Sequence, residues 1–215
     1  CCGSDLPFEL ERDTGMALTE SSMVSLGTPL PDFRLPDTDG TYYSSDDFLD
    51  RPLLVMFICN HCPYVKHIAN ELALLSRDYA QARLGMVAIQ SNDIDQYPDD
   101  RPELMHAEKE KRDYRFPYLF DESQQVAKEF QAICTPDFFL FGSDHRLVYR
   151  GRLDETRPNR IASGVYDSTG QEPHGRDLRE AIKATIEGSS VNSHQFPSVG
   201  CNIKWKVSGT PDSPR

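Results

Sequence analysis

Two cysteines spaced Cys-x-x-Cys carry the strongest chemical signal in the sequence. Cys59 and Cys62 follow residues 53–58, an unbroken apolar run that is typical of a strand buried on both faces. Pro63 suits the first turn of a helix, so we place Cys62 at the helix N-cap and Cys59 in the preceding loop. Backbone N–H groups without partners and the positive end of the helix dipole favour a thiolate at that point. The pattern therefore predicts that Cys62 is a nucleophile.

The same cysteines could serve other purposes. With a histidine such as His61 or His67 they could bind zinc or copper, but the sequence has no second Cys-x-x-Cys and no paired-histidine motif. They could also be inert, although a cysteine pair at a strand-to-helix junction favours redox chemistry. If protonated, His61 would add positive charge beside the Cys62 thiolate. We expect thiol chemistry that needs no metal and no cofactor.

The elements that must position the pair alternate between strand and helix. Apolar residues at helical spacing predict a helix from Pro63 to about residue 82, with Gly85 as its end. Further along, the pattern predicts a strand, two helices, two strands joined by a tight turn and a final helix, at residues 86–90, 102–114, 122–131, 137–141, 146–150 and 177–187. A turn-rich stretch before residue 50 favours a small hairpin leading into the domain. This order indicates an α/β fold with a mixed central sheet flanked by helices.

Length and composition indicate one domain with extensions. The chain has 215 residues, and no window approaches the roughly 20 apolar residues that a membrane helix requires, so we expect a globular protein without a membrane span. We assign residues 1–26 to an extension outside the core and residues 27–190 to the domain. Residues 191–215 form a tail that we expect to pack partly on the domain, because it contains Trp205 and Cys201.

Charge and cysteine usage narrow the function and the compartment. The net charge of −11 would repel a phosphate backbone, so we expect no nucleic-acid partner. Residues 93–113 are dense in both charges and are predicted to form a solvated surface. Six unevenly spread cysteines do not suit a disulfide-stapled mini-protein. The amino end shows no signal segment, which favours the cytoplasm; the alternative is a periplasmic or lipid-anchored protein, if Cys1 is the start of a mature lipoprotein.

Four segments in the same order resemble the thioredoxin superfamily and, within it, the peroxiredoxin-like (AhpC/TSA-like) branch of the redoxin group. They are CNHCPYV (59–65), TPDFFL (135–140), RGRLD (150–154) and GCNIKW (200–205), and the resemblance spans about residues 16–206. It implies a thioredoxin-like three-layer sandwich and a thiol–disulfide oxidoreductase. The expected substrate is a thiol or disulfide, protein or small molecule, with an unidentified thiol as electron donor.

The resemblance also leaves two assignments of the nucleophile open. In the first, Cys62 attacks, Pro63 and Tyr64 follow it as in glutaredoxins, and Cys59 resolves the mixed disulfide. In the second, Cys59 attacks and Cys62 resolves. We favour the first because it leaves Pro63 in the first helical turn.

Further residues take roles only through the resemblance. Thr135-Pro136 resembles the cis-proline turn of the superfamily, which lies beside the active cysteine and offers backbone groups to a substrate strand. Cys134, directly before this turn, and Cys201 in the tail are further candidate resolving thiols. For each of them simple packing is the other interpretation.

Two alternative functions remain beside thiol–disulfide exchange. The first is a thiol peroxidase, an antioxidant in which peroxide converts Cys62 to a sulfenic acid. Val55 and Cys59 stand where typical peroxiredoxins carry a proline and a threonine or serine, which disfavours it. Met56 stands where thioredoxins place a buried acid. The second alternative is a module without catalysis that binds copper or zinc, or senses redox state.

Overall fold

The centre of the fold is a mixed sheet of five strands. The computed structural model describes residues 18–206, and within them this sheet has the strand order β6-β5-β4-β8-β9. The strands are β4 (Leu53–Phe57), β5 (Gly85–Gln90), β6 (Tyr118–Phe120), β8 (Asp137–Phe141) and β9 (Leu147–Gly151). The β4·β5 and β5·β6 pairs are parallel, whereas β4·β8 and β8·β9 are antiparallel. The predicted mixed sheet is confirmed, and its middle strand, β4, leads directly to the cysteine pair.

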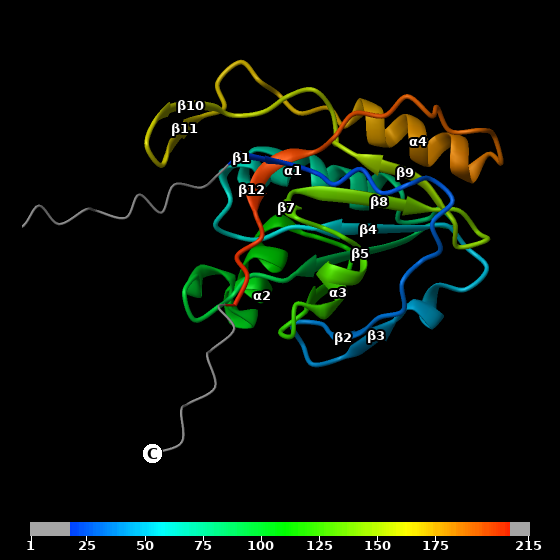
Figure 1. The fold of residues 1–215 in the computed structure, drawn as a ribbon, viewed down its shortest axis with the longest axis horizontal. Helices are drawn as coiled ribbons and strands as arrows, with labels where there is room; N and C mark the ends of the chain where they lie inside the picture. Colours follow the sequence, from blue (N-terminus) through cyan, green and yellow to red (C-terminus); the bar gives the residue numbers. More distant parts are fainter. Residues whose placement is uncertain (1–17, 207–215) are drawn as a thin grey trace, which may run out of the picture.

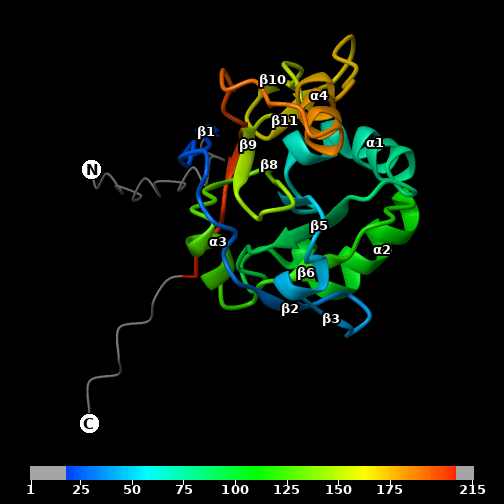
Figure 2. The same cartoon turned by 90° about the vertical axis from the view of Figure 1, so that its right-hand side faces the viewer.

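Helices cover both faces of this sheet (Figure 1). They are α1 (Pro63–Asp78), α2 (Pro102–Arg112), α3 (Gln125–Glu129) and α4 (Arg176–Ile186). Figure 2 shows α1 and α2 on one side and α3 on the other. Successive residues of β4 point to opposite faces, so Met56 packs in a cluster with residues of α1, α2 and α4, whereas Phe57 packs with α3 and the amino-terminal hairpin. The predicted three-layer sandwich with thioredoxin-like architecture is confirmed.

The end of α1, the helix that follows Cys62, differs from the prediction. α1 ends at Asp78, and tight turns follow because the amides of Ala80 and Ala82 bond to carbonyls only three residues back. Gly85 does not end the helix but begins β5. A Cβ on Gly85 would lie 2.5 Å from a ring carbon of Phe48, so the close packing of that ring requires glycine here.

Short elements complete the fold. The predicted amino-terminal hairpin is present as β2 (Arg34–Pro36) paired with β3 (Tyr42–Ser44), and a single 3-10 turn, η1 (Ser45–Phe48), follows it. A second 3-10 turn, η2 (Pro98–Asp100), lies before α2, and a hairpin of β10 (Asn159–Ala162) and β11 (Val165–Asp167) lies before α4. Sequence patterns did not predict β6, β10 or β11.

A three-stranded antiparallel sheet brings both ends of the described chain to the cysteine pair. In it β12 (Val199–Asn202) lies between β1 (Leu18–Glu20) and β7 (Cys134–Thr135). Residues 18–20, which the sequence analysis assigned to an extension, thus pair with residues of the tail. Residues 1–17 of that extension and residues 207–215 of the tail lie outside the described residues, as does Cys1 with the lipid anchor considered for it.

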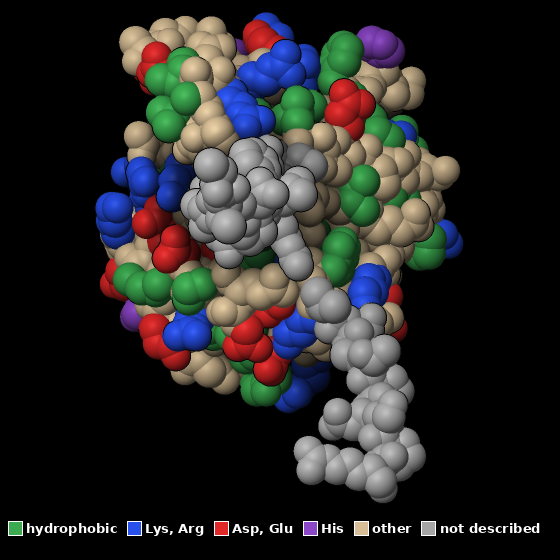
Figure 3. Space-filling view, turned by 60° about the vertical axis from the view of Figure 1, so that its left-hand side comes forward, with side chains coloured by type: hydrophobic (Ala, Val, Ile, Leu, Met, Phe, Trp, Pro, Cys, Tyr) green, Lys and Arg blue, Asp and Glu red, His purple; other side chains and the backbone are tan. Residues whose placement is uncertain are grey.

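The described chain contains no helix long and apolar enough to cross a bilayer. Acidic and basic side chains are interspersed on the face shown in Figure 3, rather than gathered into a field of one sign.

Candidate active site around Cys62

Cys62 lies between β4, which ends at Phe57, and α1, which begins at Pro63. It is the N-cap of α1, with extended backbone angles (φ −65°, ψ 122°), and Pro63 follows as the first helical residue. The amide of Lys66 donates the first helical hydrogen bond to the Cys62 carbonyl (2.9 Å). The predicted position of Cys62 at the helix start is confirmed, and Cys59 lies in the loop between strand and helix.

Three further thiols surround this position, and all four cysteines of the described chain are buried. The Sγ atoms of Cys62 and Cys201 are 2.8 Å apart. The Cys59 Sγ lies 3.3 Å from the Thr135 hydroxyl. The Cys134 Sγ points to the Pro136 carbonyl, 3.8 Å away. The structure therefore brings Cys62 and Cys201, which are 139 residues apart in sequence, into direct contact.

The surroundings of Cys62 favour its ionised form. Burial alone raises the pKa of a thiol, but hydrogen bonds from the Cys201 and Cys59 thiols, and from the backbone amides of Val65 and Cys201, hold the pKa of Cys62 well below its ordinary value. Val65 belongs to the first turn of α1, so part of this stabilisation comes from the helix terminus. When protonated, Cys62 can instead donate to the Thr135 carbonyl, 3.2 Å from its sulfur.

The surroundings of the three neighbouring thiols favour their protonated forms. The hydrogen bond to Cys62 and then burial raise the pKa of Cys201. Burial raises the pKa of Cys59 well above its ordinary value, and its hydrogen bond to Cys62 adds to the effect. Burial does the same for Cys134. Of the four buried thiols, Cys62 is therefore the one whose surroundings favour ionisation, whereas those of Cys59, Cys134 and Cys201 favour the protonated form.

Asp100 organises the loop that carries the pair. Its carboxylate accepts hydrogen bonds from the amides of Asn60 (2.8 Å) and His61 (3.2 Å) and from the Asn92 side chain (2.8 Å). The expectation that all of residues 93–113 form a solvated surface is wrong at this position, because Asp100 has no exposed surface. Its charge is compensated by these donors, and no local sequence pattern reveals partners so far along the chain.

His61 packs against the same carboxylate. Its Nδ1 lies 2.5 Å from Asp100 Oδ2, and its ring stacks on Tyr97 with the centroids 5.0 Å apart. Ligand atoms of Cys59, His61 and Asp100 lie within 4.8 Å of one another. These three residues could together hold a metal ion, but the group contains Cys59 and not Cys62.

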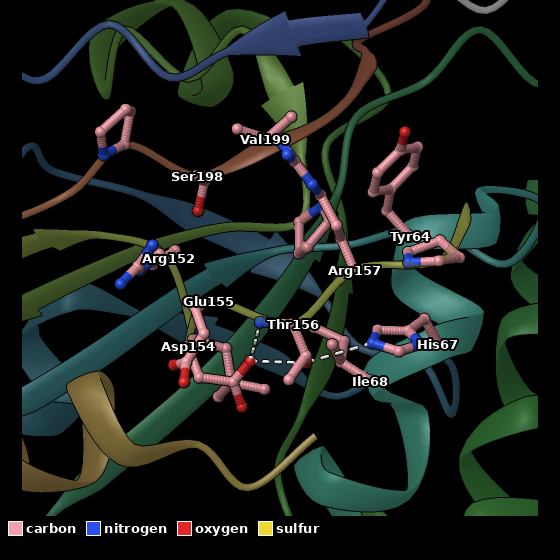
Figure 4. A pocket seen from close by; sticks show the side chains of 14 residues that line it. Tyr64, His67, Ile68, Arg152, Asp154, Glu155, Thr156, Arg157, Ser198 and Val199 are labelled. Atoms are coloured by element: carbon pink, nitrogen blue, oxygen red, sulfur yellow. Dashed lines mark hydrogen bonds between the residues drawn. The ribbon is translucent and has the colours of Figure 1, made fainter. Parts of the chain in front are cut away.

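The turn predicted to contact substrate lies beside Cys62. The Thr135-Pro136 peptide bond is cis, and both Thr135 backbone and Thr135 side chain contact the cysteine pair. Pro136 also lines a pocket of ≈160 Å³ together with Tyr64, the second residue of α1. Figure 4 shows Tyr64 and Arg157 on one side of this pocket and Arg152 on the other. Ser198 and Val199, which precede Cys201 along the chain, also line this pocket, but none of the described cysteines does.

A buried acid that sequence reasoning missed follows the turn. Asp137 pairs with Phe57 in the β8·β4 register and has no exposed surface. Burial raises the pKa of its carboxyl well above the ordinary value. Its Oδ1 accepts from the Phe138 amide at 3.1 Å, whereas its Oδ2 is buried without a hydrogen-bond partner. The sequence signal that could have revealed this buried acid is an aspartate at the start of a strand whose other residues are all apolar.

Comparison with known proteins identifies the family. The family model described as "AhpC/TSA family" matches residues 26–150, more than half of the chain. The chain belongs to the AhpC/TSA family. Its fold and the cis-proline turn agree with the resemblance to thioredoxin-like redoxins noted above. No curated protein matches the sequence significantly.

Solved structures place this AhpC/TSA-family chain among close and distant relatives. A hypothetical protein from Sinorhizobium meliloti is 44% identical, with a TM-score of 0.82 over 89% of this chain and 100% of that chain. An uncharacterized conserved protein from Geobacillus kaustophilus is 46% identical, with a TM-score of 0.82 over 91% and 100%. A secreted disulfide oxidoreductase of Mycobacterium tuberculosis is 14% identical, with a TM-score of 0.53 over 71% and 95%, and shares the fold.

Proposed function

We propose that this protein is a thiol–disulfide oxidoreductase in which the Cys62 thiolate is the nucleophile. The observation that carries the proposal is the cluster of four hydrogen-bond donors aimed at one buried sulfur at a helix N-terminus. A thiolate, not a thiol, attacks disulfides. The position of that sulfur beside the cis Thr135-Pro136 turn supports the same assignment.

The reaction proceeds by two displacements. The Cys62 sulfur attacks one sulfur of a substrate disulfide, forms a mixed disulfide and releases the other sulfur as a thiolate. A second thiol then attacks Cys62 and releases the remaining substrate thiol. The structure offers two candidates beside Cys62, namely Cys59, which the sequence analysis assigned to this role, and Cys201. An external thiol donor returns the resulting disulfide to two thiols.

The test compares oxidants under identical conditions. All proteins carry Cys1→Ser and Cys2→Ser, so that only the four described cysteines report. Reduced protein is mixed with 2-hydroxyethyl disulfide or with hydrogen peroxide, and thiol loss at Cys62 is followed by mass spectrometry. We expect the disulfide to react faster, and Cys62→Ser to abolish the reaction. Cys134→Ser serves as the matched control, since the Cys134 thiol makes no contact with the Cys62 sulfur among the hydrogen bonds of the site.

A thiol peroxidase is the second candidate, and membership of the AhpC/TSA family favours it. In that reaction Cys62 attacks peroxide, becomes a sulfenic acid and then condenses with a second thiol, releasing water. Two residues count against it. Val55, in the buried strand β4, replaces the proline of typical peroxiredoxins, and Cys59, which is hydrogen-bonded to Thr135, replaces their threonine or serine hydroxyl. Faster consumption of peroxide than of disulfide in the same assay would establish the peroxidase instead.

Metal binding is the third candidate, and the grouping of Cys59, His61 and Asp100 is the observation that favours it. Protein purified without chelator should then hold about one zinc or copper ion per chain. The thiol–disulfide proposal expects metal-free protein with a reactive Cys62. Cys59→Ser separates the two, because it removes a ligand of the grouping but leaves the nucleophile.

A further inference from the structure

The strand β12 occupies the sheet edge beside the cis-proline turn. β12 pairs antiparallel with β7, with Cys201 opposite Thr135 and Asn202 opposite Cys134. Both strands lie next to the start of α1 in Figure 1. An extended peptide that binds a sheet edge forms the same ladder of backbone hydrogen bonds. β12 thus pairs with β7 in the way that an extended peptide bound to this edge would.

β12 also places the thiol of Cys201 against the sulfur of Cys62. The Cys201 thiol and the Cys201 backbone amide both donate to the Cys62 sulfur. The two sulfurs, 2.8 Å apart, need to close only to the 2.03–2.05 Å of a disulfide bond. A mixed disulfide with a bound peptide requires the same arrangement, with a cysteine of the paired strand against the attacking sulfur.

Close packing and anchors hold the strand in this position. A Cβ on Gly200 would lie 2.0 Å from the Thr135 carbonyl oxygen, so only glycine lets β12 approach the turn this closely. Before β12, the Ser198 hydroxyl donates to the Gly151 carbonyl (2.6 Å); after it, the Ile203 amide donates to the Ile133 carbonyl (2.9 Å). Cys201 is thus held at a fixed place, as a thiol that acts on Cys62 must be.

From these contacts we propose that β12 is a built-in substrate strand and that Cys201 is the thiol that resolves mixed disulfides on Cys62. The proposal rests on the proposed function. With a low-molecular-weight disulfide RSSR′, the Cys62 thiolate forms Cys62–S–S–R and releases R′S⁻. The Cys201 sulfur then bonds to the Cys62 sulfur. The S–S bond between Cys62 and the R group breaks, and the Cys201 proton passes to the departing RS⁻. Two protein thiols are oxidised to one disulfide while RSSR′ is reduced to RSH and R′SH.

The contacts of Cys59 and Cys201 explain why Cys201 takes this role. The largest influence that raises the pKa of Cys201 is its hydrogen bond to Cys62, and this ends when the Cys62 sulfur bonds to substrate. The largest influence on Cys59 is burial at the end of β4, which the reaction does not change. Formation of the mixed disulfide therefore removes the first cause that raises the pKa of Cys201, whereas burial, the first cause that raises the pKa of Cys59, remains.

The proposal is tested by mapping disulfides in the full chain. Reduced protein in the Cys1→Ser/Cys2→Ser background is oxidised with 2-hydroxyethyl disulfide, quenched with acid, digested and analysed by mass spectrometry. We expect a Cys62–Cys201 disulfide in this parent protein, in Cys59→Ser and in the control Cys134→Ser. In Cys201→Ser, which preserves size and a hydroxyl donor, we expect the mercaptoethanol adduct on Cys62 to accumulate.

The outcomes separate this proposal from the proposed function. A Cys62–Cys59 disulfide in the parent protein, or resolution in Cys201→Ser as fast as in the parent, would overturn the role of Cys201 and leave Cys62 as nucleophile. Absence of any Cys62 adduct or disulfide in every variant would overturn both. The disulfide map of the parent protein tests the pairing of Cys62 without any substitution in the site, so a loss of stability in a variant cannot obscure the result.

Discussion

Replacement of Cys201 by alanine should make the Cys62 thiolate markedly harder to form. The change removes a thiol that donates to the buried Cys62 sulfur across 2.8 Å, and alanine fits within the space of cysteine. A hydrogen bond to a charged group contributes about 1.5–3 kcal/mol. At 1.36 kcal/mol per factor of ten, the ionisation equilibrium of Cys62 should become less favourable by a factor of roughly 10 to 150.

The ultraviolet absorbance of the thiolate measures this effect during a pH titration. Subtracting the titration of Cys62→Ser isolates the signal of Cys62 in each protein. We expect the midpoint of Cys201→Ala to move to higher pH, and that of Cys201→Ser to move less, because serine keeps a donor at the same place. A midpoint in Cys201→Ala that equals or lies below that of the parent protein would refute the account of how Cys62 is ionised.

Three further predictions concern the residues that support the site. Because burial raises the pKa of Asp137 in the folded state above 3.8, unfolding releases its proton, and wild-type stability should fall as pH rises above that value. The stability gained by Asp137→Asn over wild type should therefore grow with pH in urea unfolding, and a gain independent of pH would contradict this. Gly200→Ala should lower the free energy of unfolding by about 1–3 kcal/mol or more, since its Cβ meets the Thr135 carbonyl, and should slow formation of the Cys62–Cys201 disulfide. Gly164→Ala, with open space around it, should leave that disulfide unaffected; equal disulfide rates would argue against the close approach. Asp100→Ala should lower the free energy of unfolding by about 1–3 kcal/mol or more by leaving buried donors unpaired, measured against the exposed control Asp99→Ala, and equal stability of the two would contradict the role of Asp100.

Much of the fold and the position of Cys62 at a helix start could be predicted from local patterns. The apolar run before Cys59 and the proline after Cys62 determine a buried strand followed by a helix start, and both patterns lie within a dozen residues. Every strand of the central sheet except β6 was predicted for the same reason, as were the four α-helices of the described residues. Their ends shifted by a few residues where tight turns or close packing decided.

The resemblance named Cys201 as a candidate resolving thiol, but local patterns did not predict β12, the strand that brings it to Cys62. β12 is four residues long, contains a glycine and an asparagine, and lacks the alternation of apolar and polar residues that indicates a strand. Its pairing with β7 joins segments more than sixty residues apart, and Gly200 permits it only through a contact with a distant carbonyl. Asp100 was missed for a similar reason, because its partners come from two other segments.

The central claim is that Cys62 is the attacking sulfur. It is tested most directly by trapping its mixed disulfide in protein that carries Cys59→Ser and Cys201→Ser, so that no neighbouring thiol can resolve it. After reaction with 2-hydroxyethyl disulfide at neutral pH, peptide mass spectrometry should find mercaptoethanol on Cys62 long before any on Cys134. Modification of Cys134 first, or an unmodified Cys62, would contradict the account.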